Sequence, residues 1–389
     1  MIYLDNNATT LLDRRVAEIM LAVWQSGPLN ASSQHAAGRS ARNRLDDAVS
    51  QLGQLLGADV DSPGGDSLVL TSGGTEANNL AICGIGDSSQ PLVVSAIEHP
   101  SVLECARNQA AAGRLVRVIP VDSSGVINLD AAAELLVPAK PRPSLVSVMA
   151  ANNETGVIQP IERLAAICQA AGVPLHIDAT QSVGKLAVDF QKLNVAALTV
   201  SAHKFHGPAG IGLLLVRSGV AVRPLMYGGE QQLGKRPGTE TVALAVAMAE
   251  ALRIAIESRG QSAELMNACR EHLETTLQSE FPEIVIHGSG VARLPGTSCI
   301  SFPRVERQTM LMALDVAGIC CSSGSACASG SSQPSHVLLA MGAARPLVDT
   351  ALRFGFSRLS TLQESHQAAA TISRCYGRLG QKKPVEKSA

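Results

Sequence analysis

The chain has 389 residues, with 32 lysines and arginines against 33 aspartates and glutamates, and a formal net charge of -1. This balance provides no field to steer a polyanion, and an aromatic content of 3% leaves few side chains for stacking on bases. Direct nucleic-acid binding is therefore not expected. The length exceeds what one core usually sustains, so we expect two domains with a well-buried interior.

The first residues, Met-Ile-Tyr-Leu-Asp-Asn, have neither the charged nor the apolar region of a signal peptide, and no apolar run approaches membrane-spanning length. We expect a soluble cytoplasmic protein with no membrane partner. The nine cysteines include no C-x-x-C pair, which argues against a zinc site. Cys83, Cys168, Cys299 and Cys375 lie in apolar runs and are predicted to be reduced core residues.

The chain begins with a polar segment, residues 3–10, that cannot form a buried strand. We expect it to lie as an arm across another surface, the alternative being a frayed terminus. A helix capped by Asp13 follows, and then a loop over 27–35 in which His35 is expected at the surface. A second helix follows the loop, with an apolar stripe from Leu45 to Leu56.

A predicted strand at 68–70 leads directly into Thr-Ser-Gly-Gly-Thr-Glu, residues 71–76, and then into helical periodicity. Small residues let the backbone approach an anion, the free N-H groups at a helix start point toward it, and Thr75 adds a hydroxyl. The segment therefore indicates a phosphate site. A tight turn with an N-cap explains the same residues equally well.

Two further apolar strands, at 92–95 and 145–149, also end in polar clusters. The first runs into Glu-His-Pro, where His99 could stack on a planar cofactor and move protons, or simply be a satisfied loop histidine. The second runs into Asn-Asn-Glu-Thr-Gly, residues 152–156. Helical patterns alternate with these strands, which predicts an α/β fold with a mostly parallel sheet and helices on both faces.

The segment from His176 to Pro208 suggests the centre of an active site. Apolar runs at 173–177 and 196–200 fit buried strands, and polar side chains follow each of them. Ligands bind outside the carboxyl ends of strands in open α/β sheets, so we expect convergence there of Asp178, Gln181, Ser201, His203 and Lys204. A lysine for a Schiff base and an acid for a pyridinium nitrogen suggest pyridoxal 5'-phosphate, although an ordinary ion pair is the simpler explanation.

A glycine-rich entry at 207–212 precedes the next strand, and a long polar loop over 227–240 precedes an apolar helix from Thr241 to about Ser258. Beyond that helix the strand-helix alternation is lost. We predict a large α/β domain over 14–258, a small α+β domain formed by 1–13 and 259–380, and a flexible tail over 381–389.

Two features stand out in the small domain. Cys327 lies in a serine- and glycine-rich segment, where a thiolate could reach a substrate, or where the thiol could be incidental. Arg353 interrupts an apolar strand at 352–356, as a carboxylate-binding arginine or a structural salt bridge would. Cys320 and Cys321 could receive sulfur from a neighbouring thiol, but packing is the default interpretation.

With these segments in view, the sequence resembles the cysteine desulfurases, pyridoxal-phosphate enzymes of the class V aminotransferase group with the fold type I architecture. The motifs run in order from Tyr3 to about Arg374: Tyr-Leu-Asp-Asn-Asn-Ala-Thr-Thr, Ser-Gly-Gly-Thr-Glu, Glu-His-Pro, Asn-Asn-Glu-Thr-Gly, Asp-Ala-Thr-Gln-Ser-Val-Gly-Lys, Ser-Ala-His-Lys, Arg-Pro-Gly-Thr-Glu and Ser-Ser-Gly-Ser-Ala-Cys. The long segment around Cys327 is similar to the nitrogen-fixation and iron-sulfur-assembly branch.

The resemblance implies roles for the matching residues. Lys204 would form the Schiff base, Asp178 would hold the pyridinium nitrogen, Gln181 the ring hydroxyl, and His99 would stack on the ring as an acid/base candidate. Gly74 and Asn153 would also contact the cofactor. Phosphate contacts would come from Thr75, Ser201, His203 and, from the other subunit of a homodimer, Thr239. Asn153, Arg353 and Asn30 would bind the substrate L-cysteine, with Arg353 on its carboxylate. Cys327 would become a persulfide, pass the sulfur to an acceptor or scaffold protein, and could contact a transferred iron-sulfur cluster; no resident metal is implied.

Two positions depart from the family pattern. Ala209 follows Gly-Pro where lysine is common, and Ala31 follows asparagine where proline is usual. The expected activity is conversion of L-cysteine to L-alanine with sulfur transfer. The alternatives are a selenocysteine lyase or another class V lyase, and, from a different class, an inactive homologue that only binds a partner.

Overall fold

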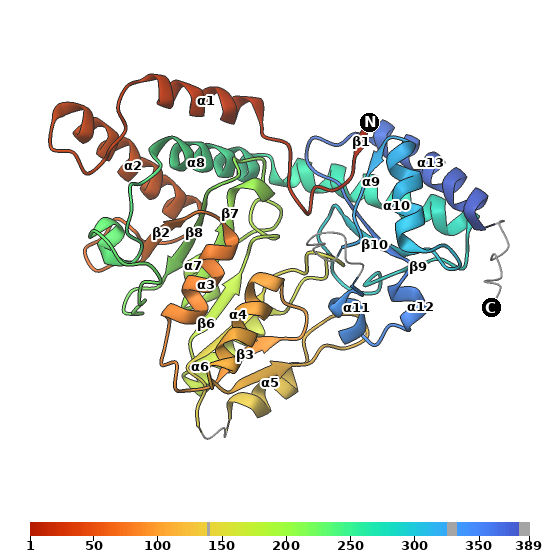
Figure 1. Ribbon diagram of the computed structural model, residues 1–389, viewed down its shortest axis with the longest axis horizontal. Helices are drawn as coiled ribbons and strands as arrows, with labels where there is room; N and C mark the ends of the chain where they lie inside the picture. Colours follow the sequence, from red (N-terminus) through yellow and green to blue (C-terminus); the bar gives the residue numbers. More distant parts are fainter. Residues whose placement is uncertain (138–140, 325–332, 381–389) are drawn as a thin grey trace.

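The computed structural model describes residues 1–137, 141–324 and 333–380. Figure 1 shows a large sheet with helices packed against it, and beside it a smaller sheet with its own helices. The strands are β1 (Ile2–Tyr3), β2 (Ser67–Thr71), β3 (Leu92–Ser95), β4 (Val116–Ile119), β5 (Leu145–Met149), β6 (Leu175–Asp178), β7 (Ala197–Ser201), β8 (Gly212–Val216), β9 (Val285–Ile286), β10 (Thr297–Ser301), β11 (Ile319–Cys320) and β12 (Ala351–Gly355).

The helices alternate with these strands in the first two thirds of the chain and dominate the last third. They are α1 (Arg14–Gln25), α2 (Ala36–Leu55), α3 (Gly74–Gly84), α4 (Pro100–Ala111), α5 (Leu129–Leu136), α6 (Ile161–Ala171), α7 (Phe190–Leu193), α8 (Val242–Glu257), α9 (Arg259–Glu280), α10 (Arg307–Val316), α11 (His336–Ala340), α12 (Arg345–Val348) and α13 (Leu362–Gly380), with short 3-10 turns η1 (Ala202–Lys204) and η2 (Gln231–Gly234).

The large sheet has the strand order β2-β8-β7-β6-β5-β3-β4 within the described residues, and only β8 runs antiparallel to its neighbours. Alternate side chains on its strands face opposite sides, as the two-residue repeat of a strand requires. On β8, for example, Leu213 and Leu215 join one core cluster and Leu214 joins another. The strands read as continuous apolar runs because both of their faces are buried.

Helices cover both faces of this sheet. Residues of α1, α2, α5, α6, α7 and α8 pack into the core cluster on one face, and residues of α3 and α4 pack into the cluster on the other. The predicted fold, a mostly parallel sheet with helices on both faces, is confirmed. The start of β8 also lies very close to the segment that follows β2. A Cβ on Gly212 would lie 2.7 Å from the carbonyl oxygen of Val200 and 2.8 Å from Gly73.

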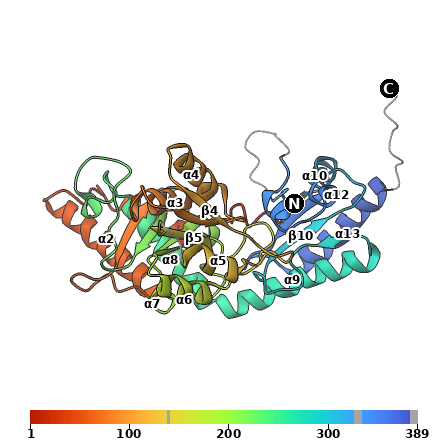
Figure 2. The ribbon, with the colours of Figure 1, turned by 90° about the horizontal axis from the view of Figure 1, so that it is seen from below.

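The small sheet is antiparallel, in the order β12-β10-β9, and Figure 2 shows α9 and α13 running alongside it. Its core cluster draws residues from α9, α10, α13, β10 and β12, and it includes Leu4 of the amino-terminal arm. This distribution of core residues supports the proposed division of the chain between 258 and 259, with the first residues assigned to the small domain.

The amino-terminal arm crosses from the small sheet to the large one. β1 pairs in parallel with β11, and Leu4 is buried. The backbone N-H of Gly355 donates to the carbonyl oxygen of Leu4, and the N-H of Thr10 donates to that of His203. The prediction of an arm across another surface is therefore confirmed. The predicted cap at Asp13 is also confirmed, because its carboxylate accepts a hydrogen bond from the backbone of Arg15 at 2.9 Å.

The cysteine prediction is confirmed only in part. Cys168 and Cys299 are buried in cores, whereas Cys83 and Cys375 are half-buried and pack against the edges of cores. Cys327 lies outside the described residues. Within the described ranges no helix has the length and apolar character needed to cross a bilayer, and no group of histidine, cysteine and carboxylate side chains is arranged to hold a metal ion.

Candidate active site

The carboxyl ends of the parallel strands bring the predicted residues to one edge of the large sheet. Thr75 follows β2, His99 follows β3, Asn153 follows β5, Asp178 ends β6, and Lys204 lies in the turn after β7. Because β3, β5, β6 and β7 are parallel and adjacent, their ends open on the same side.

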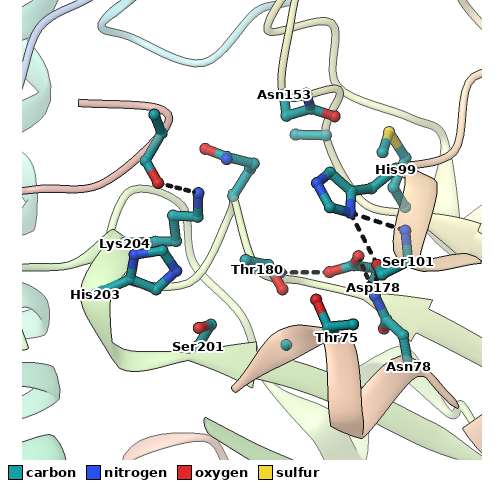
Figure 3. A pocket seen from close by; sticks show the side chains of 15 residues that line it. Thr75, Asn78, His99, Ser101, Asn153, Asp178, Thr180, Ser201, His203 and Lys204 are labelled. Atoms are coloured by element: carbon teal, nitrogen blue, oxygen red, sulfur yellow. Dashed lines mark hydrogen bonds between the residues drawn. The ribbon is translucent and has the colours of Figure 1, made fainter. Parts of the chain in front are cut away.

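These side chains surround a cavity of about 280 Å³, shown in Figure 3. Its lining consists of Ala8, Gly74, Thr75, Asn78, His99, Ser101, Met149, Ala151, Asn153, Asp178, Thr180, Gln181, Ser201, His203 and Lys204. Nine of the residues chosen from the sequence are thus brought together. Asn30, Thr239 and Arg353 are not part of the lining, and Cys327 lies outside the described residues.

Lys204 is held at the wall of the cavity by the amino-terminal arm. Its ammonium nitrogen donates to the carbonyl oxygens of Asn7 and Ala8, at 2.7 and 2.6 Å. Burial of the amine and, to a smaller extent, the positive charge of Arg353 lower the pKa of Lys204 to about 8. A lysine with such a pKa has a substantial neutral fraction near neutral pH, which a nucleophile or a base requires.

Asp178 presents a carboxylate that the surrounding residues fix in place. One oxygen accepts from the side-chain amide of Asn78 at 2.7 Å, and the other accepts from the backbone N-H of Thr180 at 2.9 Å (Figure 3). The amide of Asn78 also donates to the hydroxyl of Ser101 at 2.8 Å. Sequence reasoning missed Asn78, Thr180 and Ser101. The one available signal was position, since Asn78 follows Thr75 by one helical turn.

His99 is both a lining residue and the N-cap of α4. Its Nδ1 accepts from the backbone N-H of Ser101 at 3.1 Å, so the neutral ring carries its proton on Nε2. Burial lowers the pKa of His99, which favours this neutral form. The helix start explains why the histidine is fixed: Pro100 occupies the first helical turn, where its missing N-H and its restricted backbone are well tolerated.

The start of α3 borders the cavity with Gly74 and Thr75, and the space next to Gly74 is called the cradle. Its N-cap, Gly73, provides no side-chain hydrogen bond to the first N-H groups. A Cβ on Gly74 would lie 3.1 Å from the hydroxyl of Thr180 and 3.5 Å from the Cβ of Ser201, so a side chain there would fill the space. The hydroxyl of Thr180 is buried with no partner among the described residues. Of the two interpretations left open by the sequence, these observations favour the anion site.

Gln181 connects the cavity to a second lysine. Its amide nitrogen donates to the carbonyl oxygen of Asn7 at 3.0 Å, and its amide oxygen accepts from Lys185 at 3.1 Å. Burial lowers the pKa of Lys185 to about 7, and repulsion from Lys204 and Arg353 adds to this. Lys185 was given no role from the sequence, although it ends the motif that contains Asp178.

Arg353 does not line the cavity, but it contacts Asn153, which does. Its guanidinium donates to the carbonyl oxygen of Asn153 at 3.0 Å and pairs with the carboxylate of Asp5 at 2.8 Å. The side chain is buried, and its Nε has no partner within the described part of the chain. The arginine thus forms the salt bridge that was one of its two predicted explanations, and still holds an unused donor.

Asn30 and Thr239 are exposed. The side chain of Asn30 accepts from the backbone of Ser32 at 2.9 Å, within its own loop. Of the two departures from the family pattern, Ala31 is buried and Ala209 is exposed. None of these four residues lines the cavity.

Glu98 stabilises two of the strand ends that form the site. It is fully buried, and one carboxyl oxygen accepts from the backbone N-H of Met149 at 2.9 Å and from the hydroxyl of Ser95, which ties the end of β3 to the end of β5. Burial raises the pKa of Glu98 to about 8, and the negative charge of Asp178 adds to the rise. These shifts favour the protonated form of Glu98 in the folded protein.

Comparisons with known proteins show the family of this chain. The class V aminotransferase family matches residues 2–367. A cysteine desulfurase of Sinorhizobium fredii is 38% identical over 99% of this chain and 98% of its own length, and the cysteine desulfurase NifS of Azotobacter vinelandii is 37% identical over 93% and 89%.

Solved structures lead to the same family. A NifS-like protein from Rickettsia africae superposes with a TM-score of 0.88 and 31% identity, covering 97% of this chain and 99% of that one. SspA in complex with cysteine superposes with a TM-score of 0.78 and 29% identity, covering 92% and 99%. The chain is therefore a member of the class V aminotransferase family and belongs to its cysteine desulfurases.

Proposed function

We propose that this enzyme converts L-cysteine to L-alanine and transfers the sulfur to the thiol of Cys327, which then carries it as a persulfide to an acceptor. The supporting observation is the cavity in which Lys204, an amine with a lowered pKa, and a fixed carboxylate, Asp178, lie among the predicted cofactor-binding residues.

The residues of the cavity fit pyridoxal 5'-phosphate. The cradle at Gly74 and the unpartnered hydroxyl of Thr180 suit the phosphate, with Thr75, Ser201 and His203 around them. Asp178 would pair with the pyridinium nitrogen, and Gln181 would face the ring hydroxyl. When bound, this cofactor withdraws electrons from the amino acid attached to it.

The chain's own residues would handle binding and protons. In its neutral form Lys204 would accept a proton from the substrate and return it, because burial keeps its pKa near the working range. His99, with its proton on Nε2, would stack on the ring and donate that proton. Arg353 would bind the substrate carboxylate next to Asn153, using its free donor, and Asn30 would complete the site.

We also propose a cytoplasmic homodimer in which Thr239 of each subunit reaches the phosphate of the other. Its exposure, away from its own cavity, supports this assignment. An acceptor or scaffold protein would receive the sulfur for iron-sulfur cluster assembly or thiolation. Cysteine as substrate is supported by the relative that was solved with cysteine bound.

Replacing the thiol of Cys327 tests the proposal most directly. In the Cys327→Ala variant we expect unchanged visible absorption of the bound cofactor, and sulfide release from L-cysteine reduced about 100-fold or more, because the nucleophile is lost. Cys375→Ala, a half-buried cysteine on α13, is the matched control and should retain activity. Undiminished sulfide release by Cys327→Ala would remove the proposed role, and equal turnover of L-selenocysteine would favour the lyase alternative.

A further inference from the structure

The groove between α3 and α4 contains a pair of thiols that the proposed chemistry does not use. Cys83 lies in the last turn of α3 and Cys105 in the second turn of α4. Their sulfur atoms are 3.4 Å apart, close enough for one thiol to hydrogen-bond to the other. A disulfide would require the two atoms to approach by roughly 1.4 Å more.

Small molecules can reach this pair. A second cavity, of about 480 Å³, runs along the groove and is lined by both cysteines. Its other end is formed by Thr75, His99 and Ser101, which also line the active-site cavity. Cys83 is half-buried and Cys105 is buried, so a molecule in the groove meets Cys83 first.

The surroundings of Cys83 favour its thiolate. The hydrogen bond from Cys105 lowers the pKa of Cys83, and the positive charges of Arg114 and Arg223 lower it further. The amide nitrogen of Gln109 lies 3.4 Å from the Cys83 sulfur as a second donor. Arg114 also donates to the carbonyl oxygen of Ile82 at 3.1 Å, which offsets the negative end of the α3 dipole.

Cys105 has the opposite character. The hydrogen bond to Cys83 and burial both raise the pKa of Cys105. An accessible thiolate beside a protonated, sheltered thiol is the arrangement of an attacking and a resolving cysteine. Cys168 provides a contrast, because burial alone raises its pKa to about 12 and no charged group offsets the effect.

We propose that Cys83 and Cys105 form a redox-active dithiol that reacts with low-molecular-weight disulfides entering the groove between α3 and α4. The Cys83 thiolate attacks one sulfur of the small disulfide, forming a mixed disulfide and releasing one thiolate, which takes up the proton of Cys105. The Cys105 thiolate then attacks the sulfur of Cys83 and releases the second small fragment as a thiolate, which takes up a proton from water. The two cysteines are oxidised to a disulfide, and the small disulfide is reduced to two thiols.

The consequence for the fold is a covalent link between α3 and α4. The amino-terminal ends of these helices carry Thr75 and His99, and Cys83 lies roughly 12 Å from Thr75 along α3. A bridge at this distance would join the two helices that line one side of the active-site cavity. The inference depends on the two thiols and the groove and does not rest on the proposed reaction.

Peptide mapping of the complete holoenzyme tests the proposal. The protein is incubated with 2-hydroxyethyl disulfide, free thiols are alkylated, and the chain is cleaved after glutamates. Cleavage after Glu98 and Glu104 separates Cys83, in the fragment 77–98, from Cys105, in the fragment 105–134. We expect these fragments to be recovered joined by a disulfide, and separate again after reduction. Recovery of both fragments alkylated, with other cysteines modified, would overturn the proposal.

Two variants give distinct expected products. Cys105→Ser should stop at a mixed disulfide on Cys83, and Cys83→Ser should lower the rate of modification in the groove about tenfold or more. Cys375→Ser is the matched control, because this half-buried thiol contacts a backbone oxygen, that of Ala313 at 3.9 Å, and should leave the joined fragments unchanged. Equal modification of Cys105 in the Cys83→Ser protein would contradict the assigned order of attack. Peptide mapping detects the disulfide between Cys83 and Cys105 and does not measure enzyme turnover. A negative mapping result is therefore distinguishable from failure of the proposed function.

Discussion

At the scale of single residues, the buried ionisable groups around the cavity are controlled by desolvation more than by pairing. Burial is the largest cause of the lowered pKa values of Lys204 and Lys185 and of the raised pKa of Glu98. Each group is thereby shifted toward its neutral form. These shifts bring the pKa values of the two lysines and of Glu98 to about 7 or 8, while Asp178 is provided with two hydrogen-bond donors.

The raised pKa of Glu98 makes the free energy of unfolding depend on pH. The folded protein holds the Glu98 proton up to about pH 8, whereas the unfolded chain releases it near 4.5. Between these values the unfolded state binds fewer protons, so the contribution of Glu98 to the free energy of unfolding falls as pH rises, by roughly 1.4 kcal/mol per pH unit. In Glu98→Gln this contribution should be absent, and urea denaturation from pH 5 to pH 8 should show the variant gaining stability relative to the native protein.

Glu18→Gln is the control for that experiment, because the carboxylate of Glu18 on α1 is exposed and pairs only with Arg14. Its denaturation curves should follow those of the native protein at every pH. If the Glu98→Gln curves also ran parallel to the native ones, Glu98 would have to be ionised in the folded protein.

At the scale of elements, sequence patterns located the strands of the large sheet because most are buried on both faces and end abruptly in polar residues. The predicted runs at 92–95 and 145–149 coincide with β3 and β5. β4 was not predicted, since it is a short edge strand, and its Val118 is half exposed. The roles of Asn78 and Lys185 were also missed, because their partners are set by packing between elements that no local pattern reveals.

The glycine at the start of α3 provides a test of the cradle. Its backbone is helical, so alanine fits there, but the added methyl group would lie 3.1 Å from the hydroxyl of Thr180 and occupy space assigned to the phosphate. We expect Gly74→Ala to fold and to bind pyridoxal 5'-phosphate about tenfold more weakly, in an absorbance titration of the apoprotein.

Gly260→Ala on α9 is the matched control, because no atom lies within 4 Å of the added methyl group. It should leave cofactor affinity unchanged and add roughly 0.5 kcal/mol to the free energy of unfolding, as alanine is favoured over glycine in a helix. Unaltered affinity in Gly74→Ala would place the phosphate elsewhere.

At the scale of the whole molecule, the chain by itself lacks some of the residues proposed for its site. Thr239 and Asn30 are both exposed and away from the cavity. The proposed dimer accounts for this, at least for Thr239, by assigning it to the site of the other subunit. The sequence could indicate such a residue only through the family motif, because exposure and distance depend on the tertiary fold.

Mixing of variants tests the shared site. Lys204→Ala and Thr239→Asp are each expected to be inactive, the second because its charge would repel the phosphate. If subunits exchange after mixing, one site of each mixed dimer is intact, and about a quarter of the native activity should return. Lys204→Ala mixed with Asp178→Ala is the control, since both residues line one cavity of a single chain and no activity should return. Failure of the first mixture to recover, with exchange demonstrated, would contradict a shared site.

The amino-terminal arm has a consequence for synthesis of the protein on the ribosome. Lys204 is held by the carbonyl oxygens of Asn7 and Ala8, and the arm on either side of Leu4 is held by β11 and by Gly355. The first residues to be translated therefore reach their full set of contacts only after nearly the last residues have been made. A nascent chain can build the large sheet and its contacts with Asn7 and Ala8 early, whereas the contacts around Leu4 require β11 and β12. Complete anchoring of the arm should accordingly be a late step in the maturation of the chain.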